Sequence, residues 1–194
     1  MPAIVDHEER RAALSALAAG IIARDGLDFA TVRQIAQEAG YSTKVVSHYF
    51  PDKRSLLMAT YRYAAEETSA LAEATQRHGT DATQFAVSLL PIGKTMLGNW
   101  KVWLAFWSFA ISDKDFAVEQ RRQVRRARAR LAELLTRDSH FGHLSAKAQK
   151  DAARTVLTRI MGIALQAVFD PQDWPRDRQI DSVKETIASL KASR

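Results

Sequence analysis

Apolar residues recur along this chain at intervals of three and four positions, which is the period of an amphipathic helix. The first apolar stripe consists of Leu14, Leu17, Ala18, Ile21 and Ile22. Gly26 follows it and is suited to terminate a helix. A short stripe lies between Thr31 and Gly40, and Ser42 precedes a third helix over residues 43–49. The hydroxyls of Thr31 and Ser42 can cap the helices that follow them.

The rest of the chain keeps the helical period. Pro51 and Asp52 introduce a fourth helix, and residues 81–90 form a fifth. Pro91, with Gly93 and Gly98, predicts an irregular connection before Trp100. Four more helices are expected at residues 99–112, 116–134, 146–169 and 178–191. The pattern therefore predicts an all-α fold of about nine helices, without internal repeats.

Composition places the chain among soluble globular proteins. Of its 194 residues 46% are apolar and 26% are charged. It contains no cysteine, which excludes disulfides, thiolate metal sites and a cysteine nucleophile. No apolar run approaches 18 residues, and the N-terminus does not resemble a signal sequence. We therefore expect a cytoplasmic protein with no membrane partner.

The net charge of +6 favours a polyanionic partner, but the charge is not concentrated where a DNA-binding domain is expected. Residues 1–62 contain eight Lys or Arg against seven Asp or Glu. Residues 121–130 contain six arginines, but Val124, Ala127 and Leu131 keep one face of that helix apolar. We interpret this run mainly as a solvated helix face, with a dimer contact or an auxiliary DNA contact as alternatives.

Residues 31–50, TVRQIAQEAGYSTKVVSHYF, have the pattern of a helix-turn-helix. Such a motif needs a small residue where its two helices cross and a glycine in its turn, and Ala36 and Gly40 supply them. Ile35 and Val46 would pack the helices together. The polar residues left to face DNA from the second helix are Thr43, Lys44, Ser47 and His48.

A longer segment, AQEAGYSTKVVSHYFPDKRSLL, resembles the A-G-x-S-x-x-x-x-x-x-Y-F-x-x-K-x-x-L core of TetR-type repressors. The resemblance implies an N-terminal three-helix DNA-binding domain, which we expect over residues 1–52. A long helix would join it to a C-terminal helical domain, expected over residues 53–194, for ligand binding and dimerisation. The implied partners are a double-stranded DNA operator, a small-molecule effector and a second copy of the chain.

The same resemblance implies that Thr31 and Lys53 bind phosphates, each at the start of a helix. Lys44 stands where many relatives have glycine, and Ser47 where many have a phosphate-contacting tyrosine. Lys44 could read a guanine or bind a phosphate, and we favour the phosphate. By the resemblance, Tyr49 and Phe50 would be structural. The full candidate set for DNA binding is Thr31, Arg33, Ser42, Thr43, Lys44, Ser47, His48, Tyr49 and Lys53.

Within this family, SHYF together with NWKVWLAFWSFA resembles the choline-responsive, BetI-like repressors of the glycine betaine pathway. Trp100, Trp103 and Trp107 fall on one helix face and could line a cage for a quaternary ammonium ion. Alternatively, these rings are simply core. The candidate ligand-binding set is Trp100, Trp103, Phe106, Trp107 and Met161. Residues 160–164 lack the I-D-G-L-W pattern common in choline-type relatives, so a larger apolar cation or a neutral compound fits equally well.

We expect the last two helices to form a four-helix contact with their symmetry mates. The residues proposed for this dimer contact are Ile160, Ala164, Val168, Val183 and Ile187. The predicted function is a ligand-relieved repressor that binds a pseudo-palindromic operator. Two alternatives are a DNA-binding activator or architectural protein without a ligand, and a helical enzyme or carrier.

Enzymatic sites find little support in the sequence. The segment PIGKTML lacks the first glycine and the preceding strand of a phosphate-binding loop. Asp138, Ser139 and His140 are adjacent, which prevents the geometry of a catalytic triad. His140 and His143 have no convincing third metal ligand nearby. We therefore expect no catalytic residue, no metal and no cofactor.

Overall fold

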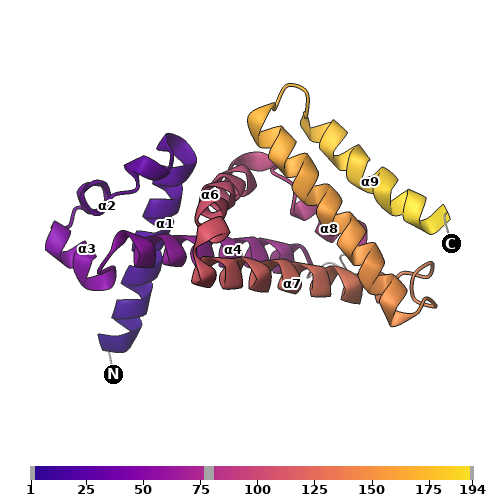
Figure 1. Cartoon of the computed structure of the whole chain (residues 1–194), viewed down its shortest axis with the longest axis horizontal. Helices are drawn as coiled ribbons and strands as arrows, with labels where there is room; N and C mark the ends of the chain where they lie inside the picture. Colours follow the sequence, from indigo (N-terminus) through magenta and orange to yellow (C-terminus); the bar gives the residue numbers. More distant parts are fainter. Residues whose placement is uncertain (1–2, 77–80, 193–194) are drawn as a thin grey trace. The chain divides into compact units, whose positions relative to one another are not determined.

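The computed structural model describes residues 3–76 and 81–192, and all regular elements in these ranges are helical (Figure 1). The elements are α1 (Ala3–Asp25), the short 3-10 helix η1 (Leu27–Phe29), α2 (Val32–Ala39), α3 (Thr43–Tyr49), α4 (Lys53–Gln76), α5 (Ala82–Ser88), α6 (Gly93–Ser112), α7 (Lys114–Thr136), α8 (Ala146–Phe169) and α9 (Arg176–Ala192). Nine α-helices in the described residues confirm the predicted all-α fold.

The connection before Trp100 differs from its prediction. An irregular segment was expected there, but α6 already begins at Gly93 and runs through Gly98. A Cβ atom at Gly98 would lie 3.4 Å from the Cβ of Ala23, an ordinary van der Waals distance, so α6 packs against the end of α1 at this position. Lys101 Nζ donates a hydrogen bond of 3.0 Å to the Ala23 carbonyl, one of the last carbonyls of α1. Gly98 therefore lies within α6 at its contact with α1 and does not break the helix.

The chain divides into two compact units, and the first comprises the residues up to Glu67 together with Gly98–Ala117. Its core joins the inner faces of α1, α2 and α3 to α4, α6 and the start of α7. Three aromatic rings continue this core: Phe106 stacks on Tyr61 with ring centroids 3.7 Å apart and on Phe116 at 4.4 Å. The core of the helix-turn-helix extends into α4 and α6, so this compact unit includes residues beyond 52, while the functional boundary expected there stays a prediction.

The second unit comprises Thr68–Leu97 and the chain from Val118 onward. Within it α8 and α9 pack against each other, and α5 contacts both. Ile160 and Ala164 of α8 and Val183 and Ile187 of α9 are almost completely buried in this unit. Four of the five residues proposed for a dimer contact are thus buried inside one chain, and their place in a dimer contact stays a prediction. Val168, the fifth, is partly exposed.

Helix α8 is long and apolar enough to cross a membrane by length and composition alone. In its most apolar window, however, 44% of the residues are buried within the chain. That pattern is typical of a core helix, as its packing against α9 and α5 indicates.

Candidate nucleic-acid interface and aromatic cluster

Helices α2 and α3 form the turn that the sequence predicts, with the predicted bounds. The Thr31 hydroxyl accepts a hydrogen bond from the Gln34 N–H at 3.1 Å, and the Ser42 hydroxyl accepts one from Val45 at 3.4 Å. Gly40 ends α2 with a φ of 69°, in the left-handed region where a side chain is strained. The N–H of Tyr41 then donates to the Ala36 carbonyl at 2.9 Å. These caps and this turn fix where α3 begins.

Helix α3 exposes its polar residues around one buried side chain. Val46 is completely buried beneath it, as are Ile35 and nearly all of Ala36 in α2. The exposed residues of this surface are Arg33, Thr43, Lys44, Ser47 and His48. A side chain must be exposed to reach a base edge or a phosphate, and these candidates for DNA contact meet that requirement.

Tyr49 lies at the end of α3 in an aromatic group that the sequence did not predict. Its ring centroid is 4.7 Å from that of His7, in α1, and 5.4 Å from that of His48. The Tyr49 ring is partly buried, which agrees with a structural role. His7 was missed because nothing in the spacing of α1 indicates that its first turns reach the end of α3.

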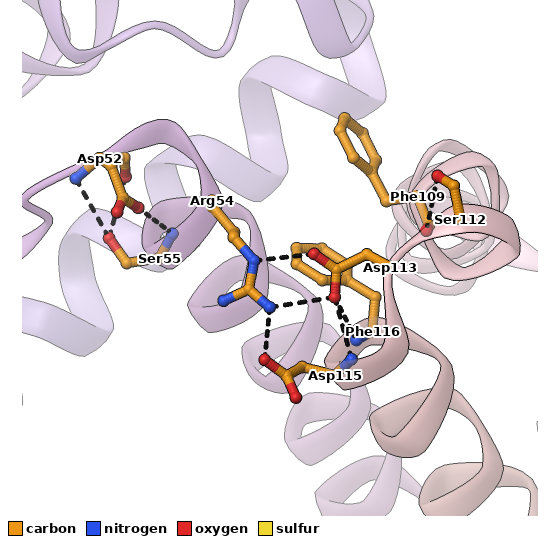
Figure 2. Close-up of polar contacts among 8 residues, drawn as sticks. All are labelled: Asp52, Arg54, Ser55, Phe109, Ser112, Asp113, Asp115 and Phe116. Atoms are coloured by element: carbon orange, nitrogen blue, oxygen red, sulfur yellow. Dashed lines mark hydrogen bonds and ion pairs between the residues drawn. The ribbon is translucent and has the colours of Figure 1, made fainter.

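The start of α4 carries Lys53, the second predicted phosphate contact. Its side chain is exposed. The helix N-terminus is not free, however, because the Asp52 carboxylate accepts a hydrogen bond from the Ser55 N–H at 2.6 Å (Figure 2). Hydrogen bonds from Ser55 also lower the pKa of Asp52. A phosphate at this end of α4 would therefore depend on the Lys53 ammonium more than on free N–H groups.

Arg54, the next residue, binds two carboxylates at the α6–α7 junction, an arrangement that we call the Arg54 clamp (Arg54, Asp113 and Asp115). Its Nε donates to Asp113 Oδ2 at 2.8 Å, and one terminal nitrogen donates to Asp113 Oδ1 at 3.0 Å and to Asp115 Oδ2 at 2.5 Å (Figure 2). The Arg54 guanidinium lowers the pKa of Asp113 to about 2. No pattern in the sequence indicates this contact, because its partners are about sixty residues apart.

The predicted face of α6 brings three indole rings together, the tryptophan cluster (Trp100, Trp103 and Trp107). Trp100 is almost fully buried and meets the other two rings edge to face, with centroid distances of 5.0 Å to Trp103 and 6.3 Å to Trp107. The Nε1 atoms of Trp103 and Trp107 are buried and have no hydrogen-bond partner among the described residues. Buried indole N–H groups normally find an acceptor, so these two donors are unusual for core rings.

Two other candidates for ligand binding do not join this cluster. Phe106 is nearly buried and stacks on Tyr61 and Phe116, so its ring packs in the core, and its role in ligand binding stays a prediction. Met161 is a partly exposed residue of α8, in the other compact unit, and its role stays a prediction.

The arginine run of α7 is largely solvated. Arg122 donates to Glu119 at 2.6 Å, and Arg130 pairs with Glu133 at 2.5 Å. Arg121, Arg125 and Arg126 are exposed. The arginine run therefore forms a charged, mostly exposed face of α7, and the buried Leu131 lies on the apolar face of the same helix.

Comparison with known proteins identifies both halves of the chain. Residues 14–60 match the family model of bacterial regulatory proteins of the tetR family, and residues 81–192 match that of the BetI-type transcriptional repressor, C-terminal. The HTH-type transcriptional regulator BetI of Burkholderia mallei is 34% identical over the full length of both chains. The BetI regulator of Vibrio parahaemolyticus is 30% identical over 92% of this chain and 90% of its own.

Solved structures show the same fold. A transcriptional regulator from Rhodococcus sp. Rha1 superposes with a TM-score of 0.80 at 23% identity, covering 93% of this chain and 95% of its own. A regulator from Saccharomonospora viridis, solved in complex with choline, superposes with a TM-score of 0.75 at 20% identity, covering 93% of this chain and 96% of its own.

Proposed function

Because the chain belongs to the tetR family of bacterial regulatory proteins, with a C-terminal part of the BetI type, we propose that it is a ligand-responsive repressor that binds its operator as a dimer. In this proposal each copy of α3 enters the major groove at one half of a pseudo-palindromic site. A small onium compound bound at the tryptophan cluster lowers the affinity for DNA. The protein would act in the cytoplasm.

At the level of the family, the chain is a transcriptional regulator and not an enzyme. The sequence-based alternative of a helical enzyme or carrier is therefore wrong. The second alternative, a DNA-binding activator or architectural protein without a ligand, differs from our proposal in one measurable property. Its affinity for DNA would not respond to any onium compound.

The exposed polar face of α3 is the observation that carries the proposal for DNA binding. Lys44, Ser47 and His48 are exposed residues of α3, and Val46 is the one residue of this helix that is buried. Thr31 supports the same surface: because its oxygen accepts the Gln34 N–H, its hydroxyl proton remains available to donate to a phosphate. These groups are exposed and are therefore accessible to DNA.

The tryptophan cluster supports a ligand that combines a positive charge with an oxygen acceptor. Indole faces attract cations, and α6 contains no Asp or Glu that could serve instead. The buried N–H groups of Trp103 and Trp107 each require an acceptor. Choline has both a quaternary ammonium and a hydroxyl oxygen, and it is the molecule bound by the Saccharomonospora viridis regulator. We therefore propose choline or a similar onium compound as the effector.

We propose that a second face of α8, which is exposed, takes part in the dimer contact. Thr158, Gly162, Leu165 and Phe169 follow one another at helical spacing and are all exposed, with Phe169 76% exposed. A Cβ atom at Gly162 would meet no neighbour within 4 Å, so another helix can approach closely there. Exposed apolar residues on one face favour a partner surface, and a second copy of α8 would supply it.

A DNA titration tests the proposal. The affinity for the DNA upstream of the chain's own gene, measured by fluorescence anisotropy, should fall steeply between about 50 and 200 mM salt. Choline should weaken it further. Lys44→Ala should reduce the slope of log affinity against log salt by about one, if Lys44 binds a phosphate. Lys150→Ala, which removes an equal charge from an exposed position of α8, is the matched control.

The outcomes separate the parts of the proposal. Equal affinity for a scrambled DNA of the same composition would contradict operator recognition. Specific binding that no onium compound changes would instead favour the ligand-independent alternative.

A further inference from the structure

We infer that Arg54 is a positioning residue that couples α6 to the start of α4, where Lys53 faces DNA. This inference rests on the proposed function. It concerns a contact within one compact unit, between residues that neither the DNA surface nor the tryptophan cluster includes.

The clamp joins two helix starts. Arg54 lies in the first turn of α4, directly after Lys53. Asp113 precedes α7, and its Oδ1 accepts hydrogen bonds from the N–H groups of Asp115 at 2.9 Å and Phe116 at 3.3 Å (Figure 2). The same oxygen accepts from Arg54, so one carboxylate caps α7 and holds α4. Any change in the position of Asp113 therefore acts on the first turn of α4.

Asp113 is also tied to α6. Its N–H donates to the Phe109 carbonyl at 2.8 Å, which makes it an extension of the last turn of α6. Trp107 lies less than two turns earlier on the same helix. A ligand that shifts α6 along or about its axis would therefore displace Asp113 with it, because a helix transmits such a movement as a rigid element.

A series of aromatic contacts also connects Arg54 with α6 and α4. The Arg54 guanidinium lies 5.4 Å from the centre of the Phe116 ring, and Phe116 stacks on Phe106 of α6. Phe106 stacks in turn on Tyr61 of α4. The rings are buried and hold the two helices together, whereas the clamp lies at the surface, with the Arg54 side chain 50% exposed.

The exposure of the clamp matters for its role. Exposed ion pairs contribute little to stability, even though the bidentate geometry here fixes direction well. A contact that is directional but easily broken suits the transmission of a small movement better than it suits stabilisation of the fold. The buried rings supply the stability, and Arg54 sets the orientation of the first turn of α4.

Hydrogen exchange of the full-length protein, with and without the DNA upstream of its gene, tests this coupling without any identified effector. Because coupling between two sites is reciprocal, DNA bound beside Lys53 should slow amide exchange in residues 104–117 by at least about twofold in the wild-type chain. Arg54→Gln should abolish that response while the thermal melting temperature stays nearly unchanged. Asp113→Asn keeps a capping oxygen and should reduce the response as Arg54→Gln does.

Arg24→Gln is the matched control. Arg24 is also an exposed arginine with two carboxylates, Asp25 and Glu38, at 2.7 Å each, but it links α1 to α2 and does not reach α6. This variant should keep the response of residues 104–117 to DNA.

Each outcome decides between the possibilities. If wild-type chain binds DNA but residues 104–117 do not respond, or if Arg54→Gln responds as wild type does, the coupling is wrong and the proposed function stands. The double variant gives a further test. If the reductions in hydrogen-exchange response caused by Arg54→Gln and Asp113→Asn add up in it, the two residues do not act through their mutual contact, which also overturns the inference. Absence of any DNA binding would instead overturn the proposed function, and this inference with it.

Discussion

In α3 the residues proposed to contact DNA are exposed around a single buried valine, whereas in α6 the residues proposed to bind a ligand are largely buried. The first surface is complete within twenty residues of sequence, because its caps, its turn glycine and its apolar contacts are all local. The second depends on what packs around α6, and one helix carries both core rings and cluster rings there. The spacing of aromatic residues on a helix therefore does not tell which of them are core and which line a site; the tertiary structure is needed to assign them.

The largest expected effect tests whether Phe106 belongs to the core rings of α6 and not to the rings proposed to bind a ligand. Phe106→Ala should lower the free energy of unfolding by about 3–5 kcal/mol, since it removes a buried ring stacked on Tyr61 and Phe116. Urea denaturation followed by circular dichroism measures this. If Phe106→Ala lowers the free energy of unfolding by less than about 1 kcal/mol, Phe106 is not part of the core.

A smaller effect is expected in the turn of the helix-turn-helix. Gly40→Ala should lower the free energy of unfolding by about 1–2 kcal/mol, because alanine is strained at a φ of 69° although the space around the new Cβ is open. The same denaturation experiment measures it. Gly20→Ala, in the middle of α1 and also with open space, should instead have no such cost.

The tryptophan cluster can be separated from ordinary core with variants that remove an indole N–H and keep an aromatic ring. Trp103→Phe and Trp107→Phe should each weaken choline binding by about 1 kcal/mol, the net worth of one hydrogen bond, in isothermal titration calorimetry. Tetramethylammonium, which has no oxygen acceptor, should lose less affinity in both variants. Equal losses for the two compounds would show that the rings act through their faces alone.

The smallest effect concerns the Arg54 clamp and its dependence on pH. The pKa of Asp113 is lowered to about 2 when folded, so its charge stabilises the folded chain above the ordinary carboxyl range and this contribution disappears as the pH falls toward 2. Asp113→Asn should therefore be slightly less stable than wild type at pH 7, and the two should converge between about pH 4 and 2. Thermal melting at several pH values measures the difference. If the difference in melting temperature between wild type and Asp113→Asn persists at low pH, the charge of Asp113 is not its cause.

The prediction from sequence was most accurate where signals are local. Thr31, Gly40 and Ser42 set the bounds of α2 and α3, since capping and left-handed glycine conformations depend on neighbours within four residues. Prediction was least accurate at Gly98, which looks like a helix breaker in sequence but lies within α6 where this helix packs against Ala23. The dimer residues show a related limit of the sequence: periodicity finds the apolar face of a helix, but both α8–α9 packing and dimerisation require such a face.

The amino-acid sequence by itself determined the helical class, the helix-turn-helix and its polar surface, and the common face of the three tryptophans, because each follows from residue types at short spacing. Only the tertiary structure decided that Phe106 is core, that Ile160 and Val183 are internal, and that Arg54 meets Asp113. These are contacts between residues distant in sequence. Their partners are selected by how whole helices pack, which no local pattern records.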